Sequence, residues 1–189
     1  MADSGQARRF AGRNLVIEER PGRACIDLRG DPNDARFARA VESVTDLRLP
    51  LEAGTCESGL LASILWLGPD QWLVSSDTQS GEALTASLRA ALRGIASAVV
   101  DVSHARIVYA VGGSNARAVL AKGCSLDLHE REFPVGRCAQ TLLAKVPILV
   151  HRASTEPTFE IHVARSFRDY AWAWLQAAAS EYAAEAGAV

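Results

Sequence analysis

Residues 101–167 constrain the fold of this chain more than any other part of its sequence. Apolar residues at positions 107–111 predict a largely buried strand, which Gly112-Gly113 then breaks. Ser114 follows as the expected N-cap of a helix, and Gly123 stands where a helix C-terminus favours a positive φ. A strand, a glycine turn and a capped helix in direct succession indicate a folded domain of mixed helix and sheet.

A similar order of elements is expected in the first half of the chain. Short apolar-polar alternations predict strands over residues 15–19, 24–28, 60–67, 72–75 and 98–102. Asp31 followed by Pro32 predicts the start of one helix, and Gly94 the end of a second. Gly68-Pro69-Asp70 predicts a tight reversal between two of the strands. This half therefore follows the order β-α-β-β-α-β.

The second half repeats that order closely enough to predict the fold class. Strands are expected near residues 139–144, 148–151 and 159–163, and Ser166 with Asp169 resembles a capping box at the start of a final helix. We predict an α+β protein of two ferredoxin-like split β-α-β units packed together. The expected division is a flexible N-terminal arm at residues 1–13, a first unit at 14–103 and a second unit at 104–189.

Composition excludes several classes of protein. Of the 189 residues, 49% are hydrophobic and 22% charged, and the net charge is −2, so no overall field favours nucleic acid or an anionic membrane. The sequence shows neither a secretory signal nor the run of about 20 apolar residues that spans a bilayer. Cys25, Cys56, Cys124 and Cys138 lack the close spacing of a disulfide or metal framework. We expect free thiols and a cytoplasmic protein.

Asp101, Ser103 and His104 have the residue types of a serine hydrolase triad but not its geometry. Adjacent residues of an extended strand point to opposite faces, so Ser103 and His104 cannot readily form the dyad. No G-x-S-x-G motif is present. We expect these side chains to fix the crossing between the two units through hydrogen bonds to the backbone, and we predict no catalytic residue.

Cofactor and metal sites are not expected either. Gly112-Gly113-Ser114 lacks the full phosphate-binding motifs, so a turn and an N-cap explain it. Cys124, His129, Cys138 and His151 lack the paired spacing of structural zinc ligands, and buried thiols are the commoner outcome. His162, beside Glu160, is expected to be a satisfied residue of an edge strand.

Trp172 leaves two explanations open. It falls to the side of the apolar stripe of the final helix, near Arg165 and Arg168, and aromatic residues beside arginines are typical of protein interfaces. Alternatively, Trp172 widens the buried face of the helix.

Four motifs occur in order through the later two thirds of the chain. They are ILWLGPDQWLV at 64–74, VVDVSHARIV at 99–108, AKGCSLDLHEREFPVGRCAQTLLAKVPILVHR at 121–152 and FEIHVARSFRDYAWAWL at 159–175. On these motifs the sequence resembles the gamma subunits of heterotetrameric sarcosine oxidases over most of residues 64–182. Val102, Ala105 and Glu130 stand where Gln, Gly and Pro are expected, and the match before Leu60 is weak.

A wider similarity concerns the fold. The strand after Asp101, the glycine turn and the Ala-Arg-x-x-Leu helix are similar to the start of the glycine-cleavage T-protein (aminomethyltransferase) family, which binds tetrahydrofolate and is built from ferredoxin-like units. This similarity implies the fold but no catalytic residue.

The resemblance to the gamma subunits implies a non-catalytic role in a complex. Such complexes oxidatively demethylate sarcosine to glycine, with hydrogen peroxide and formaldehyde or 5,10-methylenetetrahydrofolate as further products. They use FAD, FMN, NAD and tetrahydrofolate, with zinc in the delta subunit, while this chain holds no cofactor. The expected partners are alpha, beta and delta subunits. The expected contact residues are Asp101, Ser103, His104, Asp127, His129, Phe133, Arg165, Ser166 and Trp172.

Two alternative functions remain open at this stage. One is a stand-alone tetrahydrofolate-dependent aminomethyltransferase, which would act without partners. The other is a subunit of a related flavin oxidase of the dimethylglycine type.

Overall fold

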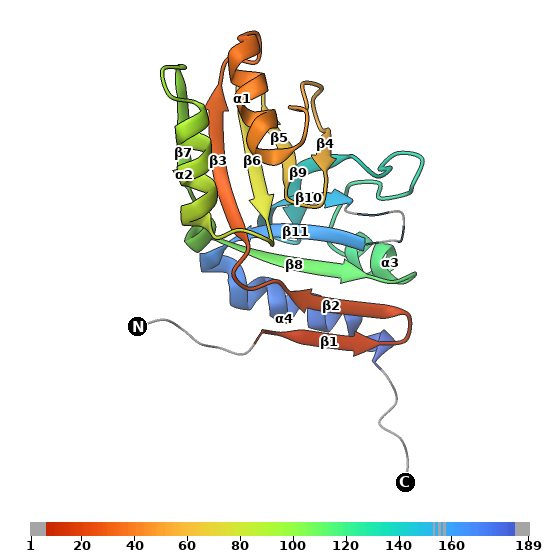
Figure 1. Cartoon of the computed structure of the whole chain (residues 1–189). Coiled ribbons are helices and arrows are strands. Elements are labelled where there is room, and N and C mark those ends of the chain that lie inside the picture. Colours follow the sequence, from red (N-terminus) through yellow and green to blue (C-terminus); the bar gives the residue numbers. More distant parts are fainter. Residues whose placement is uncertain (1–6, 153, 155, 157, 184–189) are drawn as a thin grey trace.

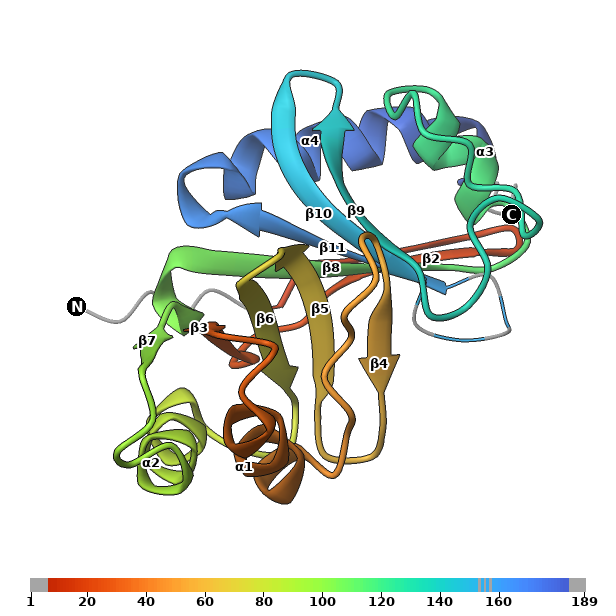
Figure 2. The ribbon, with the colours of Figure 1, turned by 90° about the horizontal axis from the view of Figure 1, so that it is seen from above.

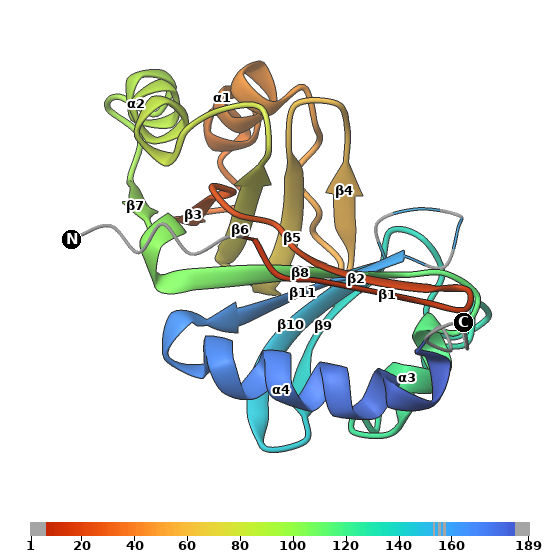
Figure 3. The ribbon, with the colours of Figure 1, turned by 90° about the horizontal axis from the view of Figure 1, so that it is seen from below.

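The computed structural model describes residues 7–152, 154, 156 and 158–183, which form four layers (Figure 1). Two antiparallel sheets, here called sheet A and sheet B, lie face to face in the middle. Two helices cover the outer face of sheet B and two cover the outer face of sheet A (Figures 2 and 3). The strands of the two sheets run across one another, as the directions of β3 and β8 show in Figure 1.

Sheet B has the strand order of a ferredoxin-like unit. Its elements along the chain are β3 (Ala24–Gly30), α1 (Ala35–Thr45), β4 (Cys56–Ser58), β5 (Ser63–Gly68), β6 (Gln71–Ser76), α2 (Gly81–Ala91) and β7 (Ser97–Asp101). Their order in the sheet is β4-β5-β6-β3-β7. Without the short edge strand β4, which the sequence did not predict, this is the order of a split β-α-β motif.

Sheet A repeats that layout with two strands, β1 and β2, from the start of the chain. Its elements are β1 (Arg9–Gly12), β2 (Leu15–Glu19), β8 (Arg106–Gly112), α3 (Ala116–Ala121), β9 (Cys138–Leu143), β10 (Val146–Arg152), β11 (Thr158–Ala164) and α4 (Arg168–Ala179). The order is β1-β2-β8-β11-β10-β9. In sheet A, β2 therefore lies beside β8 in the position that β7 takes beside β3 in sheet B. Short 3-10 helices η1 (Ser103–Ala105), η2 (Arg165–Phe167) and η3 (Ser180–Tyr182) complete the structure.

The predicted fold class is confirmed, but the predicted N-terminal arm is wrong for residues 9–12. These residues form β1, which pairs with β2, and Gly12 also bridges to Ala183 at the far end of the chain. β2, which the sequence assigned to the first unit, pairs with β8. A five-residue alternation predicts a strand but carries no information about its partner. Residues 1–6 lie outside the described part, and the boundary at residues 103 and 104 stays a prediction.

Of the helix starts predicted from the sequence, those at Ser114 and Ser166 are wrong, and the one at Asp31 lies just before the observed cap of α1. α1 begins after Asp34, whose side chain accepts a hydrogen bond from the backbone N–H of Arg36, because Asp31 instead accepts from Asn33. Neither Ser114 nor Ser166 caps a helix: α3 and α4 have no side-chain cap, although Ser80 caps α2.

Gly123 is required for a different reason from the predicted one. Its φ lies outside the left-handed region. A Cβ at this position would lie 2.3 Å from the ring of Trp174, so the glycine lets α4 pack closely over the end of α3.

Three apolar clusters fill the spaces between the layers. One lies between sheet A and its helices, a second between sheet B and its helices, and a third, smaller one between the two sheets. Trp172 packs against the first cluster and stacks on Tyr109 with 5.9 Å between ring centroids, which supports the widened buried face over an exposed interface residue. None of the described helices is long and apolar enough to cross a membrane.

Candidate functional site at the junction of the sheets

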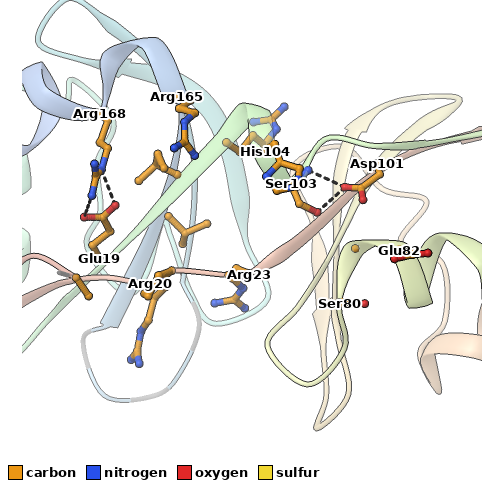
Figure 4. Close-up of a pocket in the computed structure, with 17 residues that line it drawn as sticks. Glu19, Arg20, Arg23, Ser80, Glu82, Asp101, Ser103, His104, Arg165 and Arg168 are labelled. Atoms are coloured by element: carbon orange, nitrogen blue, oxygen red, sulfur yellow. Dashed lines mark hydrogen bonds and ion pairs between the residues drawn. The ribbon is translucent and has the colours of Figure 1, made fainter. Parts of the chain in front are cut away.

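A pocket of about 460 Å³ opens where the two sheets meet (Figure 4). Its walls come from the connection between β2 and β3, the N-terminus of α2, η1 and the turn before α4. Four of the predicted contact residues line it: Asp101, Ser103, His104 and Arg165. The packing of the sheets thus brings together residues that lie far apart in the sequence.

Asp101 and Ser103 form one compact hydrogen-bonded turn. Ser103 donates both its hydroxyl, at 2.5 Å, and its backbone N–H, at 2.9 Å, to Oδ1 of Asp101. The Ser103 hydroxyl oxygen also accepts from the backbone N–H of Cys25 at 3.0 Å, which ties η1 to β3. Ser103 and Asp101 therefore make the expected hydrogen bonds to the backbone, and their role in fixing the crossing between the two units stays a prediction. The hydroxyl hydrogen bond from Ser103 is the main cause that lowers the pKa of Asp101.

Gly81 allows α2 to approach this turn. A Cβ on Gly81 would lie 2.4 Å from the Ser103 hydroxyl oxygen and 2.5 Å from Oδ2 of Asp101. The Asp101 carboxylate therefore lies against the N-terminus of α2, where the helix dipole favours a negative charge.

The arrangement does not form a Ser-His-Asp triad. Ser103 donates its hydroxyl hydrogen bond directly to Asp101, with no imidazole between the two side chains. His104, the residue after Ser103, is exposed. A triad requires the imidazole to take the serine proton and the carboxylate to orient the imidazole. Asp101, Ser103 and His104 therefore lack the geometry of that mechanism.

Positive charge predominates in the pocket. Five arginines line it, against the carboxylates of Glu19, Glu82 and Asp101. The arginines are Arg20, Arg23, Arg106, Arg165 and Arg168. Figure 4 shows Arg165 and Arg168 on one side and Arg20 and Arg23 across from them.

Two of these arginines are held in place by buried carboxylates. Arg168 donates from Nε at 2.8 Å and from Nη2 at 3.1 Å to the two oxygens of Glu19, whose side chain is 5% exposed. Arg23 donates to Glu160 on β11 at 2.5 Å and so connects sheet B to sheet A. Within the described residues, Arg106 and Arg165 have neither a hydrogen bond nor an ion pair from their side chains. Their charges are available to an anionic group that enters the pocket.

The other predicted contact residues lie elsewhere. Asp127 and His129 are exposed in the loop after α3, where the Asp127 carboxylate accepts the backbone N–H of His129 at 2.8 Å. Ser166 is exposed in η2. Phe133 is a wrong choice for a surface contact, because it is 3% exposed and packs against Phe159 in the core.

The sequence analysis missed a buried polar cluster next to the pocket. His151, Glu160 and His162 place one potential ligand atom each within 4.8 Å of one another, and no other described group could hold a metal in this way. The expectation of a satisfied edge-strand residue is wrong for His162 in both respects. β11 lies between β8 and β10 inside sheet A, and neither ring nitrogen has a hydrogen-bond partner among the described residues. Burial lowers the pKa of His151 to about 4 and that of His162 well below its usual value, so both imidazoles are neutral near pH 7. The spacing of Glu160 and His162 on one strand was the available signal.

Comparison with known proteins identifies the family. The model of the sarcosine oxidase, gamma subunit family matches residues 29–181. Sarcosine oxidase subunit gamma from Corynebacterium sp. strain U-96 is 33% identical over 186 residues, which is 97% of this chain and 89% of that protein. The protein of the same name from Arthrobacter sp is 33% identical over 170 residues, which is 89% of this chain and 82% of that protein.

Solved structures agree with this match. A chain of heterotetrameric sarcosine oxidase from Corynebacterium sp. U-96, in complex with pyrrole 2-carboxylate, has a TM-score of 0.83 at 32% identity and covers 95% of this chain and 91% of its own length. Aminomethyltransferase T of the glycine cleavage system from Bartonella henselae has a TM-score of 0.65 at 17% identity, over 87% of this chain and 46% of its own, which shows a shared fold alone. The chain therefore belongs to the sarcosine oxidase gamma subunit family.

Proposed function

We propose that this chain is a non-catalytic subunit that assembles with alpha, beta and delta subunits into a heterotetrameric sarcosine oxidase. The observation that carries the proposal is the agreement of fold and sequence with a heterotetrameric sarcosine oxidase over 95% of this chain, at a TM-score of 0.83. The complex would demethylate sarcosine to glycine and use FAD, FMN, NAD and tetrahydrofolate, with zinc in its delta subunit. The four cysteines of this chain are free and buried, which fits a cytoplasmic complex.

The pocket geometry supports a role without chemistry for this chain. Its serine is engaged with Asp101, and its buried carboxylate Glu19 is engaged with Arg168. These groups hold structure together instead of facing a reacting atom. We assign the oxidation to the partner subunits, where flavins would be bound.

The pocket itself is the proposed docking site for an acidic segment of a partner subunit. Arg106 and Arg165 offer cationic groups, and guanidinium groups bind carboxylates with two parallel hydrogen bonds. Phe167 and Tyr170, which are 39% and 45% exposed, lie next to Arg165 along the chain. An arginine beside partly exposed aromatic side chains is a common composition for the centre of an interface.

Co-expression of the four subunits with an affinity tag on this chain tests the proposal. The wild-type chain should retain a stoichiometric, flavin-containing complex. Arg165→Glu should weaken its retention at least about tenfold, since it places a carboxylate opposite the acidic segment. Arg93→Glu is the matched control, because Arg93 is exposed beyond the C-terminal end of α2, whereas the pocket is lined by the N-terminus of that helix.

Two results would count against the proposal. A tagged wild-type chain that elutes without the other subunits would refute the assembly itself. Equal retention of the Arg165→Glu and Arg93→Glu chains would leave the assembly intact and refute the pocket as the docking site.

A further inference from the structure

The buried cluster of His151, Glu160 and His162 lies on one face of sheet A. His151 is the direct cross-strand partner of Glu160, and His162 follows Glu160 by two residues on β11. Residues at this spacing project to the same face of a strand. That face is turned toward sheet B, because Leu149, the partner of His162, belongs to the apolar cluster between the sheets.

The cluster holds more polar atoms than the described residues satisfy. His151 is 1% exposed, Glu160 8% and His162 0%. Nδ1 of His151, Oε2 of Glu160 and both ring nitrogens of His162 are buried without a hydrogen-bond partner among the described residues. A buried polar atom without a partner is costly, and a bound ion would engage two of these four, Oε2 of Glu160 and one ring nitrogen of His162.

We propose that His151, Glu160 and His162 bind a divalent transition-metal ion, with Zn²⁺ as the best match. Two imidazole nitrogens and one carboxylate oxygen are a ligand set that zinc uses with three protein ligands. Nε2 of His151 and Oε2 of Glu160 are 3.4 Å apart. Two ligands at tetrahedral angles, each about 2.0–2.1 Å from zinc, are separated by about 3.3 Å. The third ligand lies within 4.8 Å of the others, a gap that a small side-chain rotation closes.

Arg23 supports the carboxylate in this arrangement. Its Nη1 donates to Oε1 of Glu160 at 2.5 Å, which leaves Oε2 directed toward His151. A hydrogen bond to the second oxygen of a ligating carboxylate is the usual way in which neighbouring residues orient a ligand. Three protein ligands leave the fourth position of a tetrahedral ion to water or an anion, and the positive charge of Arg23 favours an anion there.

A second cavity borders one of the three proposed ligands. His162 is part of the lining of a cavity of about 400 Å³, together with Arg106 and Gln140. This cavity lies between the sheets, on the side of β11 that carries the cluster. A water molecule in it can complete the coordination of the ion.

Metal binding by the full-length chain, purified with a tag that contains no histidine and stripped with a chelator, tests the site. The probes are Co²⁺, whose visible absorption reports tetrahedral coordination, and Zn²⁺, measured by competition and by metal analysis. We expect one ion per wild-type chain and a rise in the unfolding temperature with Zn²⁺. His162→Gln and Glu160→Gln should each weaken binding at least about tenfold. If the chain can be purified only in complex with its partners, complexes that carry His162→Gln or Glu160→Gln should contain one metal ion fewer than the wild-type complex.

The chain provides its own matched controls, because its four histidines divide into two buried and two exposed ones. His104→Gln and His129→Gln should keep the affinity of the wild type. The site is refuted if the wild-type chain binds no stoichiometric Zn²⁺ or Co²⁺, or if the exposed-histidine variants lose the ion and His162→Gln keeps it. His162→Leu removes the unsatisfied nitrogens: it should abolish the stabilisation by Zn²⁺ even where its stability in chelator equals that of the wild type. The two proposals can fail separately, since assembly can fail while metal binding persists, although Arg23 lines the docking pocket and also holds Glu160.

Discussion

Sheets A and B share one strand layout but are assembled from the chain in different ways. Sheet B takes all its strands from one continuous segment, residues 24–101, whereas sheet A combines residues 106–164 with the hairpin at residues 9–19. In sheet B the position next to the first strand is filled by β7, and in sheet A the same position is filled by β2. A ferredoxin-like layer can therefore be completed by a strand from the opposite end of the chain.

The helices of the two halves also differ in whether a local side chain caps their N-termini. α1 and α2 begin at Asp34 and Ser80, whose side chains cap them. α3 and α4 have no such cap and are held by contacts across the chain, such as the close approach of Gly123 to Trp174. The half with sheet B is specified mostly by local residues, and the half with sheet A mostly by long-range packing.

The largest expected effect concerns the hairpin that completes sheet A. Glu19→Gln should destabilise the fold by about 3 kcal/mol, because it removes a buried carboxylate charge that accepts two hydrogen bonds from Arg168 and also pairs with Arg8. Glu18→Gln, one residue earlier, should cost less than about 1 kcal/mol, because Glu18 pairs with the exposed Arg9. Urea denaturation compares the two; equal losses would contradict the role of the hairpin.

Gly123→Ala tests the packing of α3 against α4. Overpacking against the Trp174 ring should cost about 2 kcal/mol. The control in sheet B is Gly68→Ala, where the nearest atom to an added Cβ is 3.8 Å away, so the change should be small. Thermal unfolding of both variants measures the difference, and a neutral Gly123→Ala would show that α4 does not need this contact.

Removing a serine at a helix start should lower the stability of the protein in the half with sheet B but not in the half with sheet A. Ser80→Ala removes the side-chain acceptor for the N–H of Ala83 and should cost about 1 kcal/mol. Ser166→Ala and Ser114→Ala should change stability by less than about 0.5 kcal/mol, since neither serine caps its helix. A loss at Ser166 as large as that at Ser80 would remove the distinction.

Acid should affect the capped helix α1 over a defined pH range. Hydrogen bonds from Arg36 lower the pKa of Asp34 to about 2, below that of an unfolded aspartate at about 3.9. The stabilisation is then fully present above about pH 4 and is lost as the pH falls through about 2. The wild-type chain and Asp34→Asn should converge in stability over that range; a gap that widens on acidification would be the opposite of the expected result.

Local residues explain how much of the fold the sequence revealed. Gly68-Pro69-Asp70 forms the β5–β6 hairpin as predicted, because the reversal depends only on those residues. Asp31, the predicted cap, and Asp34, the observed one, both precede the same helix, and only the hydrogen bonds distinguish them. The pairing of β2 with β8 involves distant segments and left no local signal.

Part of the candidate site could also be predicted, because some of its residues stand out in the local sequence. Asp101, Ser103 and His104 stood out as polar residues at a strand end, and Arg165 as a cation beside aromatic residues. The convergence of the arginines depends on how the sheets pack. The metal cluster depends on the register between β10 and β11, which places His151 opposite Glu160.

The most direct test of the subunit role is to assay sarcosine-dependent oxygen consumption and complex mass with this chain alone, with the other three subunits alone, and with all four together. The account predicts that the isolated chain consumes no oxygen and that all four subunits elute as one active complex. Oxidation or methyl transfer by the isolated chain, or a complex of the other subunits that excludes it, would contradict the account.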